Sequence, residues 1–162
     1  MAAQVPSNGL NIDKGLSFPA TFSSQTGANV LDEYEEGTWT PAIASGFYAE
    51  NGYLNQSGRY VRIGRQIHCQ FAIRTQSSGW TSNGNAITIS GLPFTTVNND
   101  ARAWGCTGYH SMTPAGTGQF YGNANATVLQ MYIDGDDTFA QGSNHTDGSG
   151  KYIIGGFSYE AA

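Results

Sequence analysis

GRYVRIGRQIHCQFAIRT, residues 58–75, carries the clearest periodic pattern of the 162-residue chain. Apolar and polar residues alternate along its second half, which places one set on each face of a β-strand. One face carries Ile67, Cys69, Phe71 and Ile73, and the other carries His68, Gln70 and Arg74. Gly64 interrupts the run and predicts a tight turn or a bulge, so the segment is either a hairpin or one bent strand.

Similar strand-like segments follow one another along the rest of the chain, separated by turns. We expect strands within residues 38–44, 85–94, 101–112, 118–135 and 151–161. Pro41 suggests that the first of them is an edge strand or contains a bulge. Seven or eight strands separated by short turns predict an all-β fold, a β-sandwich or jelly-roll-like domain. Helix is expected at most as a single turn around residues 31–36.

Residues 128–133 are apolar on both faces of the predicted strand. Leu129, Met131 and Ile133 share one face, while Val128 and Tyr132 lie on the other. A strand with this pattern is expected to be covered on both sides, by a second sheet and by a partner subunit.

The composition fits one all-β domain with many tight turns. The chain contains 22 Gly, 12% aromatic residues and only 12% charged residues, and glycine-rich sequences of this kind are typical of strands joined by turns. The length is sufficient for one domain with a sizeable core, and no linker divides it.

Residues 1–30 differ from the rest because they show neither helical nor strand periodicity. We expect an extended N-terminal arm there, followed by a β-sandwich knob over residues 31–162. The arm carries apolar residues at irregular spacing: Leu10, Ile12, Leu16, Phe18 and Phe22. An arm surrounded by water would not need them, so these residues are expected to dock into other subunits.

Charge and hydropathy exclude several classes of partner. The chain has only seven Lys and Arg residues and a net charge of -5, which is too little positive charge to bind phosphate groups. Neither nucleic acid nor an anionic membrane surface is therefore an expected partner. The sequence has no run long enough to cross a membrane and no secretory signal, so we expect synthesis in a cytoplasm without membrane insertion. The two cysteines, Cys69 and Cys106, are expected to be core thiols rather than a disulfide.

Residues that could support catalysis or bind a metal occur without the necessary spacing. The histidines are His68, His110 and His145, and no two of them are spaced to share one face. IDGDDTFAQGS, residues 133–143, offers three aspartates but lacks the ligand spacing and final Glu of a calcium loop, so a solvated turn is favoured. We therefore expect no enzyme, no metal and no cofactor; Glu50 and Asp100 are the loop acids that would test a glycan-degrading alternative.

Several aromatic residues lie in or beside the predicted loops and are candidates for contact with a receptor: Tyr48, Tyr53, Trp80 and Tyr109. Flat aromatic faces flanked by Asn, Gln and Ser can stack on sugar rings while the amides bond hydroxyl groups. The alternative is that these rings fix loops onto the domain or line a subunit interface.

LDEYEEGTWTP, residues 31–41, places four of the 12 acidic residues of the chain within five positions. Arginine guanidinium groups match carboxylates bidentately, and the following strands are rich in arginine. We hypothesise that the acidic group meets the arginine group, within the chain or between subunits, and fixes where the arm enters the domain. The residues concerned are Asp32, Glu33, Glu35, Glu36, Arg59, Arg62 and Arg65. The alternative is a solvated acidic turn.

Three segments in the first half of the chain carry motifs that are specific in combination. They are FPATFSSQTGANVLDEYEEGTWTPAI at residues 18–43, NGYLNQSGRYVRIGRQIHCQFAI at 51–73 and ITISGLPF at 87–94. Together they resemble a module that recurs in fibre proteins of tailed bacteriophages, in which an F-P-A segment precedes motifs similar to LDDYEEGTWTP, GRYVRIG and GLPF. The resemblance covers residues 18–94 and extends to the remainder by strand character only.

The resemblance implies a virion component, because members of that family are typically C-terminal β-sandwich domains of trimeric fibres. Such fibres have a long shaft before the module, whereas about 30 residues precede it here, so the arm itself would attach the domain to the particle. We expect a short trimeric knob on a tail fibre or tail tip that could contact the host surface. The alternatives are a capsid-bound head fibre or decoration protein and a standalone carbohydrate-binding lectin.

The expected partners follow from this reading. They are two further copies of the chain in a homotrimer and other virion subunits of the tail or capsid, and a host-surface glycan is a further candidate. The expected location is the virion, assembled in the bacterial cytoplasm.

Overall fold

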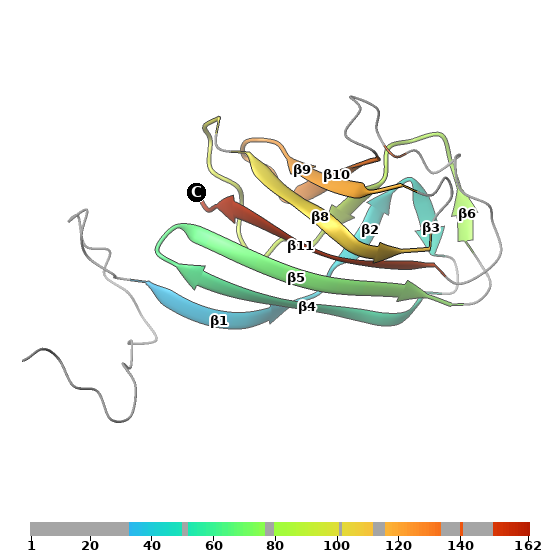
Figure 1. Ribbon diagram of the computed structural model, residues 1–162, viewed down its shortest axis with the longest axis horizontal. Coiled ribbons are helices and arrows are strands. Elements are labelled where there is room, and N and C mark those ends of the chain that lie inside the picture. Colours follow the sequence, from blue (N-terminus) through green and yellow to red (C-terminus); the bar gives the residue numbers. More distant parts are fainter. Residues whose placement is uncertain are drawn as a thin grey trace, which may run out of the picture.

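The computed structural model describes residues 33–49, 52–76, 80–100, 102–111, 116–133, 140 and 151–162, with the backbone alone for 47–49 and 80–82. These ranges contain eleven strands and no helix, so the all-β prediction is confirmed (Figure 1). The strands are β1 (Tyr34–Trp39), β2 (Ala42–Ser45), β3 (Phe47–Ala49), β4 (Tyr53–Ile63), β5 (Gln66–Thr75), β6 (Trp80–Ser82), β7 (Thr88–Ser90), β8 (Ala103–His110), β9 (Gly118–Gly122), β10 (Val128–Ile133) and β11 (Tyr152–Glu160).

Nine of these strands form one antiparallel sheet in the order β1-β4-β5-β11-β8-β9-β10-β7-β2, and β3 pairs with β6 in a second, small sheet. The two outermost strands of the large sheet, β1 and β2, are consecutive in sequence and are separated only by Thr40 and Pro41. A connection this short spans roughly 10 Å. The sheet therefore curls until its two ends meet, and the result is a sandwich-like domain made from a single curled sheet (Figure 1).

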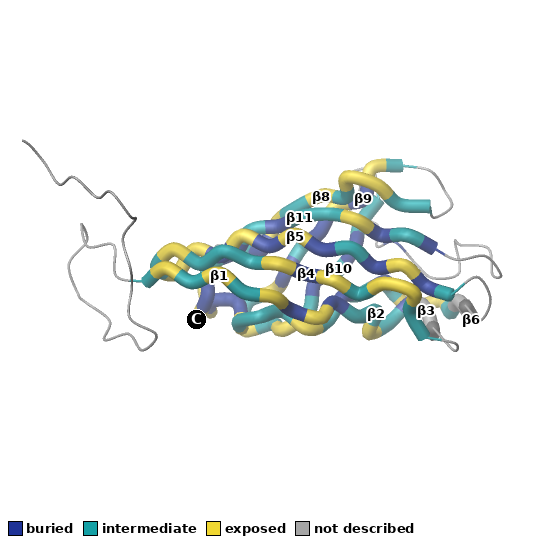
Figure 2. The backbone as a smooth tube through the Cα atoms, turned by 90° about the horizontal axis from the view of Figure 1, so that it is seen from below, coloured by how far each residue is buried: buried dark blue, intermediate teal, exposed yellow. Residues whose placement is uncertain are grey.

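The core lies inside the curl. Fully buried positions alternate with exposed ones along β5, as predicted from the periodicity of residues 66–75, and Figure 2 shows this alternation. Trp39 reaches across from β1, with ring centroids 5.8 Å from Phe71 and 5.7 Å from Phe157. The other large buried apolar residues include Ile67, Ile73, Ile87, Ile89, Phe120, Leu129, Met131 and Ile153.

The β4–β5 hairpin organises the first half of the sheet. Gly64 occupies its turn with a positive φ of 57°, a conformation that glycine adopts without steric cost. The two possibilities left by the sequence are thereby resolved in favour of a hairpin.

Three expectations need correction. Residues 38–44 do not form one strand, because Thr40 and Pro41 carry the chain from one end of the sheet to the other. Residues 34–36, where at most a turn of helix was expected, are part of β1 and pair with β4. Phe47–Ala49 is a strand rather than a loop, and the described ranges contain eleven strands rather than seven or eight.

Candidate functional site

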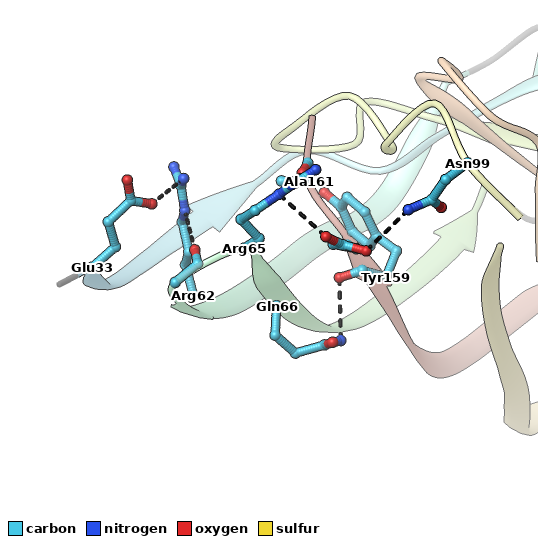
Figure 3. A network of polar contacts seen from close by, with 9 residues as sticks. Glu33, Arg62, Arg65, Gln66, Asn99, Tyr159 and Ala161 are labelled. Carbon is cyan, nitrogen blue, oxygen red and sulfur yellow. Dashed lines mark hydrogen bonds and ion pairs between the residues drawn. The ribbon is translucent and has the colours of Figure 1, made fainter. Parts of the chain in front are cut away.

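The chain enters the domain beside the tip of the β4–β5 hairpin. The Glu33 carboxylate forms an ion pair with Arg62, and its backbone carbonyl accepts a hydrogen bond of 2.7 Å from Gly64 N–H. Arg62 Nε also donates to the Gly64 carbonyl at 2.8 Å (Figure 3). The predicted meeting of the acidic segment with the arginine-rich strands is thus present in the Glu33–Arg62 pair. We call this region, with Arg65 and Glu160, the entry junction.

The C-terminal end of β11 is held at the same hairpin. Arg65 Nε lies 3.2 Å from a Glu160 carboxylate oxygen and donates to the Ala161 carbonyl at 3.1 Å, while Ala161 N–H donates to the Arg65 carbonyl at 2.8 Å (Figure 3). Asn99 donates its side-chain amide to the other Glu160 oxygen at 3.3 Å. The entry junction therefore binds the start of β1 and the end of β11 to one turn.

The two ion pairs of the junction differ in burial. The side chains of Arg62 and Glu33 are only 20% and 17% exposed, whereas those of Arg65 and Glu160 are 57% and 31% exposed. Solvent screens exposed ion pairs strongly, and removal of one partner from a mostly buried pair leaves a desolvated charge behind. The Glu33–Arg62 pair is therefore the more important of the two for stability.

The motif strands β1 and β4 also interlock through glycines. Their register places Gly37 opposite Tyr60 and Trp39 opposite Gly58. A Cβ atom added to Gly37 would lie 2.5 Å from the Tyr60 ring, and one added to Gly58 would lie 2.4 Å from the Trp39 indole nitrogen. Each strand therefore provides the space that the aromatic ring of the other occupies.

The third motif segment joins the same cluster. The Phe94 ring lies edge-on to Tyr60, with centroids 5.4 Å apart, and the Arg62 guanidinium lies 4.8 Å from the Phe94 centroid. The Tyr60 hydroxyl donates a hydrogen bond to Glu35. This hydrogen bond, together with burial and the negative charge of Glu35, raises the pKa of Tyr60 to about 12. The three motif segments therefore form one packed unit.

The remaining charged residues of the predicted group have other surroundings. Glu36 accepts a hydrogen bond from Tyr34, and Arg65 pairs with Glu160 rather than with the acidic segment. Arg59 lies opposite Thr38 and points away from the core, and it forms no ion pair with any described residue. Asp32 lies outside the described residues.

The outer face of the sheet is a second candidate site. Two rows of cross-strand neighbours follow from the pairing. The first row is Glu36, Val61, His68, Ser158, Trp104 and Tyr121, and the second is Thr38, Arg59, Gln70, Gly156, Cys106 and Gln119. These side chains belong to strands β1, β4, β5, β11, β8 and β9 and face away from the core.

An open groove of about 900 Å³ crosses this face. Its floor includes small residues, among them Gly156, Ala72 and Ser57, and Trp104 and Ile154 are apolar side chains of its β8 and β11 part. A smaller hollow continues from it toward Glu36 and shares Arg59, His68 and Gln70. We call the combined hollow the outer groove.

The polar side chains of the outer groove are partly oriented by one another. His68 Nδ1 is 3.0 Å from the Ser158 hydroxyl on the neighbouring strand. This contact fixes the imidazole ring and leaves Nε2 as the second polar atom of the ring. With Gln70 and Arg59, the groove offers donors and acceptors beside an apolar ring, which is the combination that recognises polyhydroxylated ligands.

The aromatic residues predicted as receptor contacts are not gathered in one place. Tyr53 packs against the core, and its hydroxyl accepts a 3.0 Å hydrogen bond from Ile43 N–H, which gives it a structural role. Tyr109 is 55% exposed on β8, with its ring 6.1 Å from that of Tyr152. Tyr48 and Trp80 belong to the small sheet, in β3 and β6 respectively.

Sequence reasoning missed Trp104, which is 71% exposed on β8. It also placed Cys106 in the core, where only Cys69 is buried; both thiols are free and Cys106 is exposed. Burial raises the pKa of the Cys69 thiol to about 12. The available signal was the alternation of residues 103–107, in which Trp104 and Cys106 share one face and Ala103 and Gly105 share the other.

Several further predictions concern residues whose positions bear on the site. Among the described residues, no cluster of three or more His, Cys, Asp or Glu side chains could hold a metal, and no helix could cross a membrane. His110 contacts the Gly116 carbonyl at 2.6 Å. Several residues of the predictions lie outside the described ranges. They are the expected docking residues of the arm (Leu10, Ile12, Leu16, Phe18 and Phe22), the loop acid Glu50, the turn at residues 134–139 and His145.

Comparison with family models, curated proteins and solved structures finds no match to the chain.

Proposed function

We propose that the chain is a structural protein of a bacteriophage virion, a short fibre-like knob that residues 1–30 attach to the particle. The observation that carries this proposal is the packing of the fibre-like motifs. Residues 34–41, 58–64 and 91–94 form one unit around Tyr60, although they are far apart in sequence. This packing supports the proposal because the segments that carry the resemblance belong to one structural unit.

The two ends of the domain differ, which supports attachment to the particle at one end and contact with the host at the other. The chain enters at the junction, and Figure 1 shows β3 and β6 at the opposite end from the start of β1. The candidate receptor residues Tyr48 and Trp80 belong to those two strands. A knob held by its arm would therefore carry strands β3 and β6 at its outer end.

Exposed apolar residues near the entry junction support assembly into a homotrimer. Tyr34 and Ile63 are cross-strand neighbours and are 38% and 50% exposed. A contact between copies at this position would cover both side chains. We assign the contact between copies to this end of the domain, beside the arm.

The proposal is tested on the full chain and on intact particles. Sedimentation analysis should give three times the chain mass of 17.2 kDa, and antibodies against the protein should label virions in electron micrographs. Ile63→Asp should weaken the trimer, while Leu54→Asp, at a residue also about half exposed but at the other end of β4, should leave it intact. A monomeric protein that is absent from virions would refute the proposal.

The same micrographs distinguish two positions on the particle. Label at the tail would identify a tail fibre or tail tip, in which the outward end contacts the host surface. Label on the head would identify a capsid-bound head fibre or decoration protein. In both cases the proposed role is binding and assembly rather than catalysis.

A second candidate function is that of a standalone carbohydrate-binding protein. The outer groove favours it, because Trp104 and several hydrogen-bonding side chains line one hollow. A lectin of this kind would not require its arm. Deletion of residues 1–30 would then leave sugar binding and the oligomeric state unchanged, and the protein would be absent from virions.

A further inference from the structure

We infer that the outer groove binds an acidic oligosaccharide. The inference deepens the adhesive part of the proposed function, on which its biological use rests, by naming a site and a ligand class. The site lies on the sheet rather than in the loops where receptor contacts were predicted.

Trp104 provides the aromatic surface. Its side chain is 71% exposed although it belongs to a regular strand; its cross-strand neighbours are the small residue Ser158 on the groove side and Tyr121, outside the groove lining, on the β9 side. Exposure of so large an apolar ring contributes nothing to folding. The small neighbour Ser158 on the groove side leaves room there for the apolar face of a sugar to stack on the ring.

Arg59 provides the charge. In the larger part of the outer groove it is the sole residue with a fixed charge among the described ones, and the carboxylate of Glu36 lines the adjoining smaller hollow, which Arg59 also lines. Since the chain as a whole has a net charge of -5, this local positive charge is opposite in sign to the rest of the molecule. A guanidinium with no ion pair among the described residues is suited to bind the carboxylate of a ligand.

The extent of the groove sets the size of the ligand. Trp104 on β8 and Arg59 on β4 are separated by β11 and β5 in the sheet. Three strand spacings correspond to about 14 Å. A single sugar ring is too short to touch both residues, so the ligand is an oligosaccharide whose acidic residue lies near Arg59.

The backbone of the groove argues against an extended peptide. Peptides that bind sheets usually add a strand and form main-chain hydrogen bonds at an exposed edge. Strands β4, β5, β11 and β8 are each paired on both sides, so they offer no such edge. Recognition therefore depends on the side chains Trp104, His68, Gln70 and Arg59, which suit hydroxyl and carboxylate groups.

The test uses the purified full chain and an array of bacterial di- to tetrasaccharides, with and without uronic or sialic acid residues. We expect binding to acidic members of the array. The best acidic ligand and a neutral analogue are then titrated by calorimetry at low and high NaCl. Affinity for the acidic ligand should fall as salt rises, because salt screens its contact with Arg59.

Variants locate the ligand. Trp104→Ala should reduce affinity at least tenfold, and Arg59→Gln should reduce the preference for acidic over neutral ligand at least tenfold. The matched controls are Leu54→Ala, an exposed apolar residue on β4 outside the groove lining, and Arg74→Gln, an arginine on the same face outside the lining. Both controls should bind normally, and thermal unfolding should verify that all four variants are folded.

Each contrary result overturns the inference. These results are no binding to any acidic oligosaccharide, preference for neutral sugars, and binding that survives Trp104→Ala. If Trp104→Ala instead changed the mass of the protein in solution, the groove would be a contact between copies. The virion experiments fail separately, because particle labelling does not depend on Trp104 and sugar binding does not depend on the particle.

Discussion

At the scale of single residues, the glycines of β1 and β4 determine whether the two motif strands can pair closely. Gly58 and Gly37 face the aromatic rings of Trp39 and Tyr60, and a Cβ atom at either position would lie within 2.5 Å of ring atoms. Real Cβ contacts are not this short, so the rings would have to move. Glycine is required at these two positions because it has no side chain, which leaves room for the rings, and its conformational freedom is not the reason.

Gly58→Ala is accordingly expected to destabilise the protein by about 1 to 3 kcal/mol, the usual cost of overpacking a filled interior. Gly108→Ala is the matched control, because Gly108 is also a strand glycine but its added Cβ would have no neighbour nearer than 3.9 Å. Urea unfolding of both variants measures the difference. Equal stability of the two variants would contradict this account of the interlocked strands.

Tyr60 makes stability dependent on alkaline pH. Its pKa is raised from 10.0 to about 12 in the folded protein, so the folded state retains the phenolic proton at pH values where the unfolded state has lost it. The stabilisation is complete below about pH 10 and declines between about pH 10 and 12. The protein should therefore lose stability in that interval.

Tyr60→Phe should be less stable than wild type at pH 7, because the Glu35 carboxylate loses its hydrogen bond. It should also lose less stability than wild type between pH 9 and pH 11. Chemical unfolding at these pH values tests both expectations. Tyr109→Phe, at an exposed tyrosine far from Glu35, provides the control; parallel pH profiles for wild type and Tyr60→Phe would reject the assignment.

At the scale of strands, the entry junction shows how one hairpin tip connects elements from both ends of the described chain. β1 begins there through Glu33 and Arg62, and β11 ends there through Glu160 and Arg65. The two ion pairs have the same chemistry and differ in exposure. This difference makes the junction a direct comparison between a mostly buried pair and an exposed one.

Arg62→Glu should destabilise the protein by about 3 kcal/mol, because it leaves the Glu33 carboxylate mostly buried beside a like charge and removes the contact with Phe94. Arg65→Glu should cost less than about 1 kcal/mol, since its pair is exposed to water. Thermal and urea unfolding measure both. The swap Glu33→Arg with Arg62→Glu should recover part of the loss; no recovery would mean that the pair itself contributes little.

The sequence allowed β5 and the hairpin to be predicted because alternation there is strict and one face is strongly apolar. It did not reveal that residues 38–44 contain the connection between the two ends of the sheet. Pro41 is equally compatible with a bulge, an edge strand and a break, and only the pairing of β2 with β7 distinguishes them. Long-range pairing of this kind leaves no local trace.

Strand β8 shows why Trp104 was not predicted as part of the outer groove and why Cys106 was wrongly placed in the core. Alternation separates two faces of a strand but does not tell which face is buried. In β8 the larger residues Trp104 and Cys106 point outward, because the inward position of Gly105 is crowded by Phe157. The expectation that apolar residues face the core was therefore wrong for Cys106, and the same inversion placed Trp104 in the outer groove.

At the scale of the whole molecule, the two thiols report separately on the surface and on the core. Cys106 should be alkylated by iodoacetamide in the native protein, whereas Cys69 is buried with a pKa of about 12 and should react only on unfolding. Mass spectrometry should therefore find one modification in buffer and two in urea. Cys106→Ser should show none in buffer, and rapid double modification of native protein would contradict the described core.

The position of β11 has a consequence for how the chain is made. The last strand of the chain lies in the interior of the sheet, between β5 and β8. A nascent chain that still lacks residues 152–160 cannot pair β5 with β8 through β11, so the edges of β5 and β8 stay unpaired until this strand is synthesised. The large sheet is therefore expected to form only after residues 152–160 have left the ribosome, and a product truncated before them should be a substrate for chaperones and proteases rather than a partly functional domain.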